Sequence, residues 1–170
     1  MTTMLETRRL RLREFRPDDL DELAALMADD EQMRFYPGPR TLREAHAWLD
    51  RNRSLYEQQG FGFWLIESRS TSTFLGYCGI RPLELEGAPT TEIGWHTTKA
   101  SWNQGIATEA AAGVRDLAST RFAKPQLLAL IHPDHVASRR VAEKIGMREN
   151  GAVIVEGDPY LTYVSGYRAR

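Results

Sequence analysis

The sequence predicts one α/β domain built around a mixed sheet, and three observations support this fold class. Segments with strand and helix periodicity follow one another in the order β-α-α-β-β-β-α-β-α-β-β, which is typical of a single mixed α/β domain. The 170 residues suffice for one domain with a substantial core. No linker, repeat or low-complexity stretch divides the chain, so we expect one domain over residues 1–170 with its core at about 7–167.

The first third of the chain predicts one strand followed by two helices. Apolar residues alternate with arginines over Thr7–Phe15, which indicates the strand. The run Pro17-Asp18-Asp19 is typical of a helix start, because proline and acidic side chains are tolerated in a first turn. Thr41 and Glu44 have the spacing of a capping box, so we expect a second helix from there to about Gln59.

The middle of the chain predicts three strands. Two apolar runs, Phe61–Glu67 and Phe74–Arg81, are separated by the polar segment 68–73, which indicates a turn. Gly87-Ala88-Pro89 is expected to break the chain before a third strand, Thr91–Thr97.

The last third predicts helices and strands in alternation. An Ala-rich amphipathic helix is expected to end near Phe122 and to be followed by a short apolar strand at Gln126–Ile131. Helical spacing returns over Val136–Ile145, and two final strands are expected near Ala152–Val155 and Tyr160–Tyr167. The strand, helix and strand around the Ala-rich helix should form a right-handed βαβ unit with its ligand at the carboxyl end of the first strand.

Composition and charge exclude several classes of protein. Hydrophobic residues make up 42% and charged residues 26% of the chain, and 22 Lys and Arg nearly balance 23 Asp and Glu. This balance offers no basic face for nucleic acid, and no apolar run approaches the ~20 residues of a membrane span. Residues 1–13 lack the apolar segment of a secretory signal, and the single Cys78 excludes an intrachain disulfide. We therefore expect a cytoplasmic monomer or homodimer with no nucleic-acid or membrane partner.

The stretch Trp102–Ala110 is the most informative part of the sequence. It lies where the Ala-rich helix begins, and a helix N-terminus offers unpaired backbone N–H groups together with a partial positive charge. A turn of small residues would let a phosphate approach these donors, although the stretch is neither a P-loop nor G-x-G-x-x-G. The alternative is an ordinary strand-to-helix turn whose small residues serve close packing.

Four stretches together resemble the GNAT superfamily of N-acetyltransferases, in particular its RimJ/RimL-type branch. They are Met33–Pro37, Thr91–His96, Trp102–Ala110 and Pro133–Met147. The last two are similar to the family's W-G-x-G-[YI]-A-T-E-A phosphate loop and to its P-x-N-x-x-S-x-R-V-x-E-K-x-G-F segment. The resemblance implies a GNAT-like mixed, mostly antiparallel sheet of about seven strands with about four helices. It also implies transfer of the acetyl group of acetyl-CoA to a primary amine by direct attack. The expected acceptor is a protein N-terminal amine or a small-molecule amine.

The resemblance also implies which residues bind acetyl-CoA. They are Trp95, His96, Thr97, Asn103, Gln104, Gly105, Ile106, Ala107, Thr108, His135 and Ser138. Three positions depart from the family pattern: Asn103 replaces a Gly, His135 replaces an Asn, and Ala142 occupies the position of a Tyr that many members use as a general acid. Asn adopts left-handed backbone more readily than other non-Gly residues, so the turn at Asn103 can survive the replacement.

Three side chains are candidates for the catalytic roles. Glu92 is the first candidate for the general base, because a carboxylate within a sheet strand is uncommon, and the alternative is a solvated glutamate at the strand edge. His96 is the second, with a packed, wall-forming histidine as the alternative. On an extended strand these two share a face with Gly94, whereas Ile93, Trp95 and Thr97 share the other. The resemblance implies that Ser138 lies beside the CoA sulfur and protonates the leaving thiolate, and the alternative is a capping serine.

Other features point to no further chemistry. His132 and His135 have metal-like spacing without further ligands, so no metal is expected. Cys78 lies in an apolar strand and is interpreted as a buried structural residue. Two rival functions remain open, a CoA-binding module without turnover and a nucleotide-phosphate enzyme, for which no base-reading or metal constellation is evident.

Overall fold

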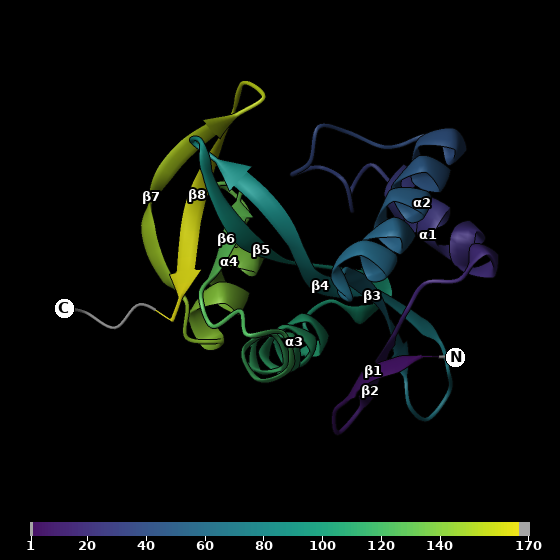
Figure 1. Cartoon of the computed structure of the whole chain (residues 1–170). Helices are drawn as coiled ribbons and strands as arrows, with labels where there is room; N and C mark the ends of the chain where they lie inside the picture. Colours follow the sequence, from purple (N-terminus) through teal and green to yellow (C-terminus); the bar gives the residue numbers. More distant parts are fainter. Residues whose placement is uncertain (1, 167–170) are drawn as a thin grey trace.

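The computed structural model describes residues 2–166, in which eight strands form one sheet and four α-helices cover it (Figure 1). The strand order is β1-β2-β3-β4-β5-β6-β8-β7, and every neighbouring pair is antiparallel except β5 and β6. The strands are β1 (Thr3–Glu6), β2 (Leu10–Arg13), β3 (Phe63–Ser68), β4 (Phe74–Leu85), β5 (Ala88–Thr97), β6 (Leu127–Ile131), β7 (Arg148–Val155) and β8 (Asp158–Ser165). The helices are α1 (Leu20–Ala28), α2 (Leu42–Gln59), α3 (Ile106–Phe122) and α4 (Val136–Lys144). The predicted mixed, mostly antiparallel α/β architecture is confirmed, with eight strands instead of about seven.

The additional strand comes from the N-terminus, where the strand predicted over residues 7–15 is present as β2 but spans only Leu10–Arg13, and the unpredicted β1 precedes it. This part of the chain turns back after Glu6, so that β1 and β2 form an antiparallel hairpin. Thr7 closes the turn, because its N–H donates to the carbonyl of Leu10 over 2.9 Å and its hydroxyl accepts from the N–H of Leu10 over 3.1 Å. A threonine side chain thus supplies a turn that no Gly or Pro announces.

Two further strand boundaries differ from the prediction because the hairpins turn on two residues each. Residues 87–89 do not break the chain, since Ala88 already pairs with Leu85. Glu86 and Gly87 make the turn with φ of 51° and 79°. The β7–β8 hairpin turns in the same way at residues 156–157, with φ of 53° and 93°. Positive φ at both central residues matches the right-handed twist of the strands, so the hairpins run to their tips. Tyr167, predicted in the last strand, lies outside the described residues.

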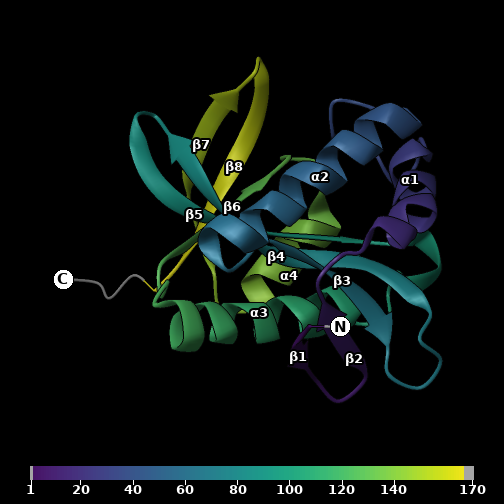
Figure 2. The same ribbon diagram turned by 45° about the vertical axis from the view of Figure 1, so that its right-hand side comes forward.

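Apolar side chains divide between the two faces of the sheet, as the period of 2 along a strand requires. Helices α1 and α2 cover one face and α3 the other, with α4 beside α3 (Figure 2). The α3 face buries Leu10, Leu12, Trp64, Ile66, Cys78, Ile80, Ile93, Ala110, Ala111, Val114, Ala118 and Ala142. The α1 and α2 face buries Phe15, Leu23, Leu26, Met27, Ala45, Leu49, Phe63, Leu65 and Tyr77. Cys78 is fully buried, as predicted.

The start of α2 is set by side-chain hydrogen bonds, whereas α1, α3 and α4 have no side-chain cap bond. In α2 the predicted capping box is present: the hydroxyl of Thr41 accepts from the N–H of Glu44 over 3.3 Å, and the Glu44 carboxylate accepts from the N–H of Thr41 over 2.8 Å. The predicted start at Pro17 is only a 3₁₀ turn over Pro17–Asp19, and α1 begins at Leu20. No helix among residues 2–166 is long and apolar enough to cross a membrane.

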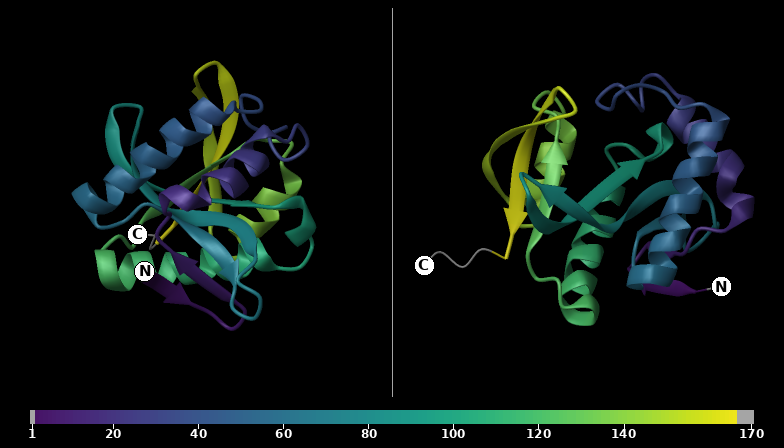
Figure 3. Two further views of the ribbon diagram at one scale, coloured as in Figure 1. Left: turned by 90° about the vertical axis from the view of Figure 1, so that its right-hand side faces the viewer. Right: turned by 45° about the horizontal axis from the view of Figure 1, so that its top comes forward.

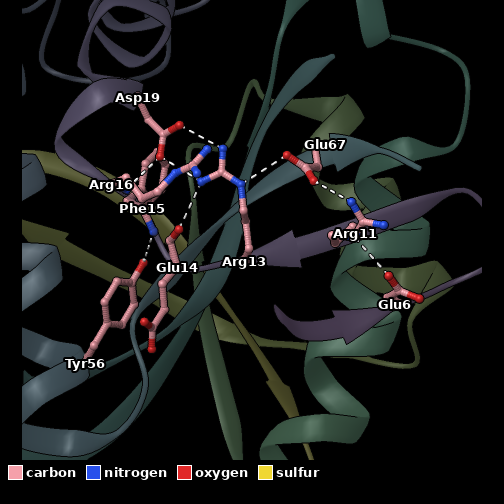
Figure 4. Close-up of polar contacts among 9 residues, drawn as sticks. All are labelled: Glu6, Arg11, Arg13, Glu14, Phe15, Arg16, Asp19, Tyr56 and Glu67. Atoms are coloured by element: carbon pink, nitrogen blue, oxygen red, sulfur yellow. Dashed lines mark hydrogen bonds and ion pairs between the residues drawn. The ribbon is translucent and has the colours of Figure 1, made fainter. Parts of the chain in front are cut away.

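A buried charge cluster, the Arg13 group of Arg13, Asp19 and Glu67, joins β2, β3 and the 3₁₀ turn (Figure 4). The Arg13 guanidinium makes two hydrogen bonds of 2.8 Å to the Asp19 carboxylate and one of 3.1 Å to Glu67. Asp19 also accepts from the N–H of Arg16 over 2.6 Å, and Arg11 donates to the second oxygen of Glu67 over 3.1 Å. These bonds fix where β2 ends and how the chain enters α1.

The sheet opens between β5 and β6, its one parallel pair among the described strands. The two strands pair only at Glu92 and Leu128 and then separate. From Ile93 onward β5 therefore has a partner on one side only, which is β4. This separation creates the gap around which the candidate site is built.

Candidate active site

The free edge of β5 presents backbone groups to the gap. The N–H of Thr98 donates to the carbonyl of Leu75 on β4 over 3.0 Å, which fixes the alternation of the strand. Since successive backbone groups of a strand point in opposite directions, those of Trp95 and Thr97 point away from β4 and toward the gap. The Thr97 carbonyl accepts from the Trp102 indole over 3.1 Å. Free N–H and C=O groups along a gap can bind an extended amide-containing chain by strand-like hydrogen bonds.

A pocket of about 180 Å³ lies at the point where β5 and β6 separate. It is lined from both faces of the sheet. It brings together two of the three candidate catalytic residues, Glu92 and Ser138, whereas His96 is not among its lining residues. Its lining residues come from α1, the α1–α2 connection, α2, β3, β4, β5, β6, the β6–α4 connection, α4 and β8. They include Tyr36, Arg40, Trp48, Phe63, Tyr77, Arg81, Glu92, Trp95, His135, Ser138 and Tyr160.

Three connections lie on one side of the molecule. They are the α1–α2 connection and the tips of the β4–β5 and β7–β8 hairpins, which all rise toward the top in Figure 1 and in the left view of Figure 3. The α1–α2 connection supplies Tyr36 and Arg40 to the pocket, and the β7–β8 hairpin supplies Tyr160. These two connections therefore add side chains to a pocket whose other walls come mostly from the strands of the sheet.

Glu92 faces the pocket on the α1 and α2 side of the sheet. Its side chain is 12% exposed and forms an ion pair with Arg81, its cross-strand partner on β4. The alternation predicted for β5 is confirmed, because Ile93 and Trp95 pack with the core on the α3 side, whereas His96 contacts Tyr77 on the other. Glu92 is thus the carboxylate that the described part of the pocket lining contains.

His96 is buried, and both of its ring nitrogens have partners. Nε2 lies 3.1 Å from the carbonyl of Gln32, and Nδ1 lies 3.3 Å from the hydroxyl of Tyr77. A carbonyl can only accept, so Nε2 carries the proton and Nδ1 accepts from Tyr77. The ring also stacks on Tyr36 with centroids 4.9 Å apart. Burial lowers the pKa of His96 to about 4, and its hydrogen bond to Gln32 opposes this only in part. The imidazole is therefore neutral at pH 7.

Ser138 of α4 meets Trp95 of β5 across the gap. The indole Nε1 donates to the serine Oγ over 3.0 Å. An indole can only donate, so Ser138 accepts in this contact and its own hydroxyl proton stays available. Ser138 lies in the first turn of α4, but no cap bond from it is present, since His135 is the N-cap residue and makes none.

The turn before α3 has the backbone that an anion site requires. Asn103 has φ of 59° and Gly105 has φ of 74°, and α3 begins at Ile106. Residues 102–105 are exposed, and a Cβ on Gly105 would meet no atom closer than Nη2 of Arg9, at 3.4 Å. The N–H groups of Ile106, Ala107 and Thr108 lie in the first helical turn, where no intrahelical acceptor exists. These residues fit a diphosphate, which would bind the exposed N–H groups.

Arg9 is a residue of this region that sequence reasoning missed. Its guanidinium bonds the carboxylate of Glu109 over 2.6 Å and the carbonyl of Gln104 over 2.9 Å, while its N–H donates to Glu109 over 2.9 Å. It thus ties the β1–β2 turn to the first turn of α3. The carboxylate of Glu109 indicates in the sequence that a cationic partner is needed. The sequence does not identify this partner as Arg9, because Arg9 lies 100 residues away in the chain.

The two histidines before α4 do not converge on a metal. Phe35 lies against both: its ring stacks on His135 with centroids 4.3 Å apart and lies 5.5 Å from His132. Burial, followed by the charge of Arg34, lowers the pKa of His135 to about 4. Within residues 2–166 no group of three or more His, Cys, Asp or Glu side chains is arranged to hold a metal ion.

Comparisons with known proteins agree with this geometry. The sequence model of the acetyltransferase (GNAT) domain matches residues 9–148. The chain is 34% identical over 162 residues to a protein of Bacillus subtilis (strain 168) that is described as uncharacterized and named YkkB. This match covers 95% of this chain and 94% of YkkB. A crystal structure of an acetyltransferase from Agrobacterium tumefaciens str. C58 is similar with a TM-score of 0.86 and 26% identity over 98% of this chain and 95% of that one.

A more distant structure shares the fold alone. It is RimL, a ribosomal L7/L12 α-N-protein acetyltransferase, in complex with coenzyme A. It has a TM-score of 0.79 at 16% identity and covers 96% of this chain and 97% of that one. The family match spans most of the chain and includes the turn before α3, the free edge of β5 and Ser138. The chain belongs to the GNAT acetyltransferase family and is an acyltransferase that uses acetyl-CoA.

Proposed function

We propose that this acetyltransferase acts on a primary amine by direct attack, and that the amine is a protein N-terminus or a small molecule, as in the RimJ/RimL-type branch. The observation that carries the proposal is the free edge of β5, which leads from the exposed turn at residues 102–105 to a pocket containing Glu92 and Ser138. The motif at Trp102–Ala110 supports the branch.

The coenzyme would be held mainly by main chain. Its diphosphate would bind the N–H groups of Gln104 to Thr108, and its pantetheine arm would bind the free backbone groups of Trp95 and the N–H of Thr97. Backbone donors of this kind also polarise a thioester carbonyl, and one such donor is worth roughly 3–4 kcal/mol in the transition state of another enzyme. The coenzyme supplies the acetyl thioester, and this chain supplies the donors that orient it.

Two side chains then move protons. The amine nitrogen attacks the thioester carbonyl carbon, the C–S bond breaks, and the amine loses a proton. Glu92 is the group in the pocket that can accept this proton, directly or through a water. Ser138 can donate its proton to the departing thiolate, because Trp95 occupies its acceptor side only. Ala142, fully buried in the α3 core, offers no alternative acid.

In this proposal His96 is a positioning residue and does not transfer a proton. Its Nε2 proton is bonded to Gln32, and its Nδ1 is occupied by Tyr77. A base needs a free lone pair aimed at the substrate. The histidine instead joins β5 to the α1–α2 connection, whose residues line the pocket. Glu92 is therefore the stronger of the two candidates for the base.

Substitution of Gly105 tests the coenzyme site. Gly105→Asp puts a carboxylate against the proposed diphosphate, so acetyl-CoA affinity should fall at least about 100-fold by calorimetry, and thiol release with amine acceptors should be lost. Gly105→Asn is the matched control, because Asn tolerates φ near 74° and brings no charge. Unchanged affinity in Gly105→Asp, or equal losses in both variants, would contradict the proposal.

A further inference from the structure

Arg40 is a cation of the pocket that the proposed chemistry does not use. It lines the pocket from the segment just before α2, and its side chain is half-buried. Within residues 2–166 this side chain makes no ion pair and no hydrogen bond to protein. The backbone is nevertheless held firmly: its N–H donates to the carbonyl of Met27 over 2.7 Å, and the next residue, Thr41, caps α2. A guanidinium without a protein partner, on a backbone held in place beside the pocket, is available to a ligand.

The other charges of the pocket do not neutralise Arg40. Arg81 and Glu92 pair with each other across β4 and β5. The formal charges of the described lining residues Arg40, Arg81 and Glu92 therefore sum to one positive charge. The charge of Arg40 acts on Tyr77, another residue of the pocket lining. Burial raises the pKa of Tyr77, and of the nearby charges Arg40 opposes this rise most strongly. An acceptor that brings one negative charge would complement this site.

The remaining walls select a small acceptor with an apolar body. They are formed by aromatic rings and methionines, among them Met27, Met33, Tyr36, Trp48, Phe63 and Tyr77. The volume of about 180 Å³ is below the ~300–1,000 Å³ of pockets that enclose drug-sized ligands. It suits a molecule of amino-acid size, or the terminal residue of a longer chain.

We propose that the acceptor is an amine that carries a carboxylate close to the amino group, most simply an α-amino acid with an apolar or aromatic side chain, and that Arg40 binds this carboxylate. This inference rests on the proposed acetyl transfer and narrows its acceptor. The reacting form of such an acceptor has a neutral amine and one carboxylate, so its net charge of −1 complements the pocket. A guanidinium can hold a carboxylate by two parallel hydrogen bonds, which also fixes the distance of the amine from Glu92.

The test compares acceptors that differ only in the carboxylate. Thiol release is measured at saturating acetyl-CoA with L-phenylalanine and L-phenylalaninamide, and with L-methionine and its amide, each rate corrected for the fraction of neutral amine. The acids should have kcat/KM at least about 10-fold above their amides, since one charge-assisted contact accounts for about 10- to 100-fold. Amides used as well as the acids would overturn the inference.

Variants of Arg40 assign the preference to this residue. Arg40→Gln should raise KM for the acids by about 10- to 100-fold, leave the amides unchanged and leave KM for acetyl-CoA unchanged. Arg40→Lys should restore part of the preference. Arg43→Gln is the matched control, because Arg43 is exposed on α2 outside the pocket lining. A preference for acids that survives in Arg40→Gln would also overturn the inference.

Two further measurements separate the possible outcomes. Amidated dipeptides that begin with methionine and continue with glutamate or glutamine show whether the recognised carboxylate belongs to a peptide side chain. If the glutamate peptide is preferred over the free acids, the acceptor is a protein N-terminus and the inference of a free amino acid is overturned. If no amine is acetylated, the proposed function fails. Calorimetric binding of the same acids and amides to the protein with CoA then decides the role of Arg40 by itself, with binding of the acids lost in Arg40→Gln as the supporting result.

Discussion

The Arg13 group and the pocket group of Arg81, Glu92, Trp95 and Ser138 both pair polar side chains from different elements of the fold, yet they differ in which hydrogen-bonding groups they leave unpaired. In the Arg13 group each charged side chain is about 95% buried, and every carboxylate oxygen has a donor. In the pocket group the Arg81–Glu92 pair has a single contact, with Arg81 half-exposed, and the Ser138 hydroxyl keeps its proton.

This difference teaches how one sheet separates stability from chemistry. A buried charge without a partner is costly, so a cluster in the core must be fully paired, and once paired it has nothing left to offer a substrate. A site that acts on a substrate needs the opposite, donors and acceptors that remain free until the ligand arrives. Substitutions in the two groups should therefore move different observables, and the following experiments test this.

The largest effect is expected from Ser138→Ala in the pocket group. If the hydroxyl protonates the leaving thiolate, its loss should lower kcat by about 10²–10⁴ with little change in the free energy of unfolding. Single-turnover kinetics with acetyl-CoA measure the step directly. Trp95→Phe is the matched control, because it removes the indole donor and keeps an aromatic ring at the position. Equal losses in both variants would mean that Ser138 acts only through its contact with Trp95.

Asp19→Asn in the Arg13 group should instead reduce stability. Removing one charge leaves the Arg13 guanidinium buried with a weaker partner, which should cost about 3–5 kcal/mol in urea unfolding while kcat of the folded enzyme stays the same. Asp18→Asn, at the exposed neighbouring position, is the control and should be neutral. A loss of activity in Asp19→Asn at a temperature where the variant is folded would break the proposed separation.

Acid should remove the stability that the ionised Asp19 carboxylate contributes. Burial raises the pKa of Asp19, but hydrogen bonds from Arg13 and from the N–H of Arg16 outweigh it, and the net pKa lies below the usual 3.8. For a carboxyl with a lowered folded pKa, the stability is present above 3.8 and is lost as pH falls through the folded pKa. Unfolding free energies of Asp19→Asn and the parent chain should therefore converge below pH 3.8.

The contrast between the two groups also shows what a sequence can reveal. The turn before α3 was predictable because its residues are contiguous and because a helix N-terminus has the same free N–H groups in any fold. Positive φ at Asn103 follows from residue type as well. Contiguous residues likewise made it possible to predict the capping box of α2 and the residues on each face of β5.

The Arg13 group was not predictable, because period-2 alternation suggests that an arginine between Leu12 and Phe15 points to solvent or to the strand edge. Its burial depends on Glu67, which lies 54 residues away. The same limit applies to His96, whose partner Gln32 lies 64 residues away, and to Arg40, whose entry into the pocket depends on how α1 and α2 pack. Long-range pairing decided each of these positions.

His96 is intermediate between the two groups, because it is buried like Arg13 but contacts Tyr36 and Tyr77 of the pocket wall, so its effect should be smaller. Its pKa is about 4 in the folded chain against 6.5 when unfolded. The unfolded state therefore binds a proton first, and stability should fall as pH decreases from 6.5 toward 4, by up to about 3 kcal/mol. His96→Gln keeps a donor for the Gln32 carbonyl and should flatten this slope in urea unfolding. His46→Gln, at an exposed position of α2, is the control and should leave the slope intact.

Glu92→Gln should have the smallest effect and gives the sharpest contrast with Asp19→Asn. The Arg81–Glu92 pair is partly exposed, so breaking it should cost less than about 1 kcal/mol of stability. An α-amino group with a pKa near ~8 is about one-tenth neutral at pH 7. A general base should therefore raise kcat/KM by roughly 10-fold at pH 7 and by little above pH 8. With an N-terminal peptide or amino acid amide as acceptor, the variant should lose about 10-fold in kcat/KM at pH 7 and approach the parent enzyme in alkali. If the acidic limb of the pH profile of kcat/KM is identical in Glu92→Gln and the parent enzyme, Glu92 is not the base. A large drop in the free energy of unfolding would instead show that the Arg81–Glu92 pair is structural.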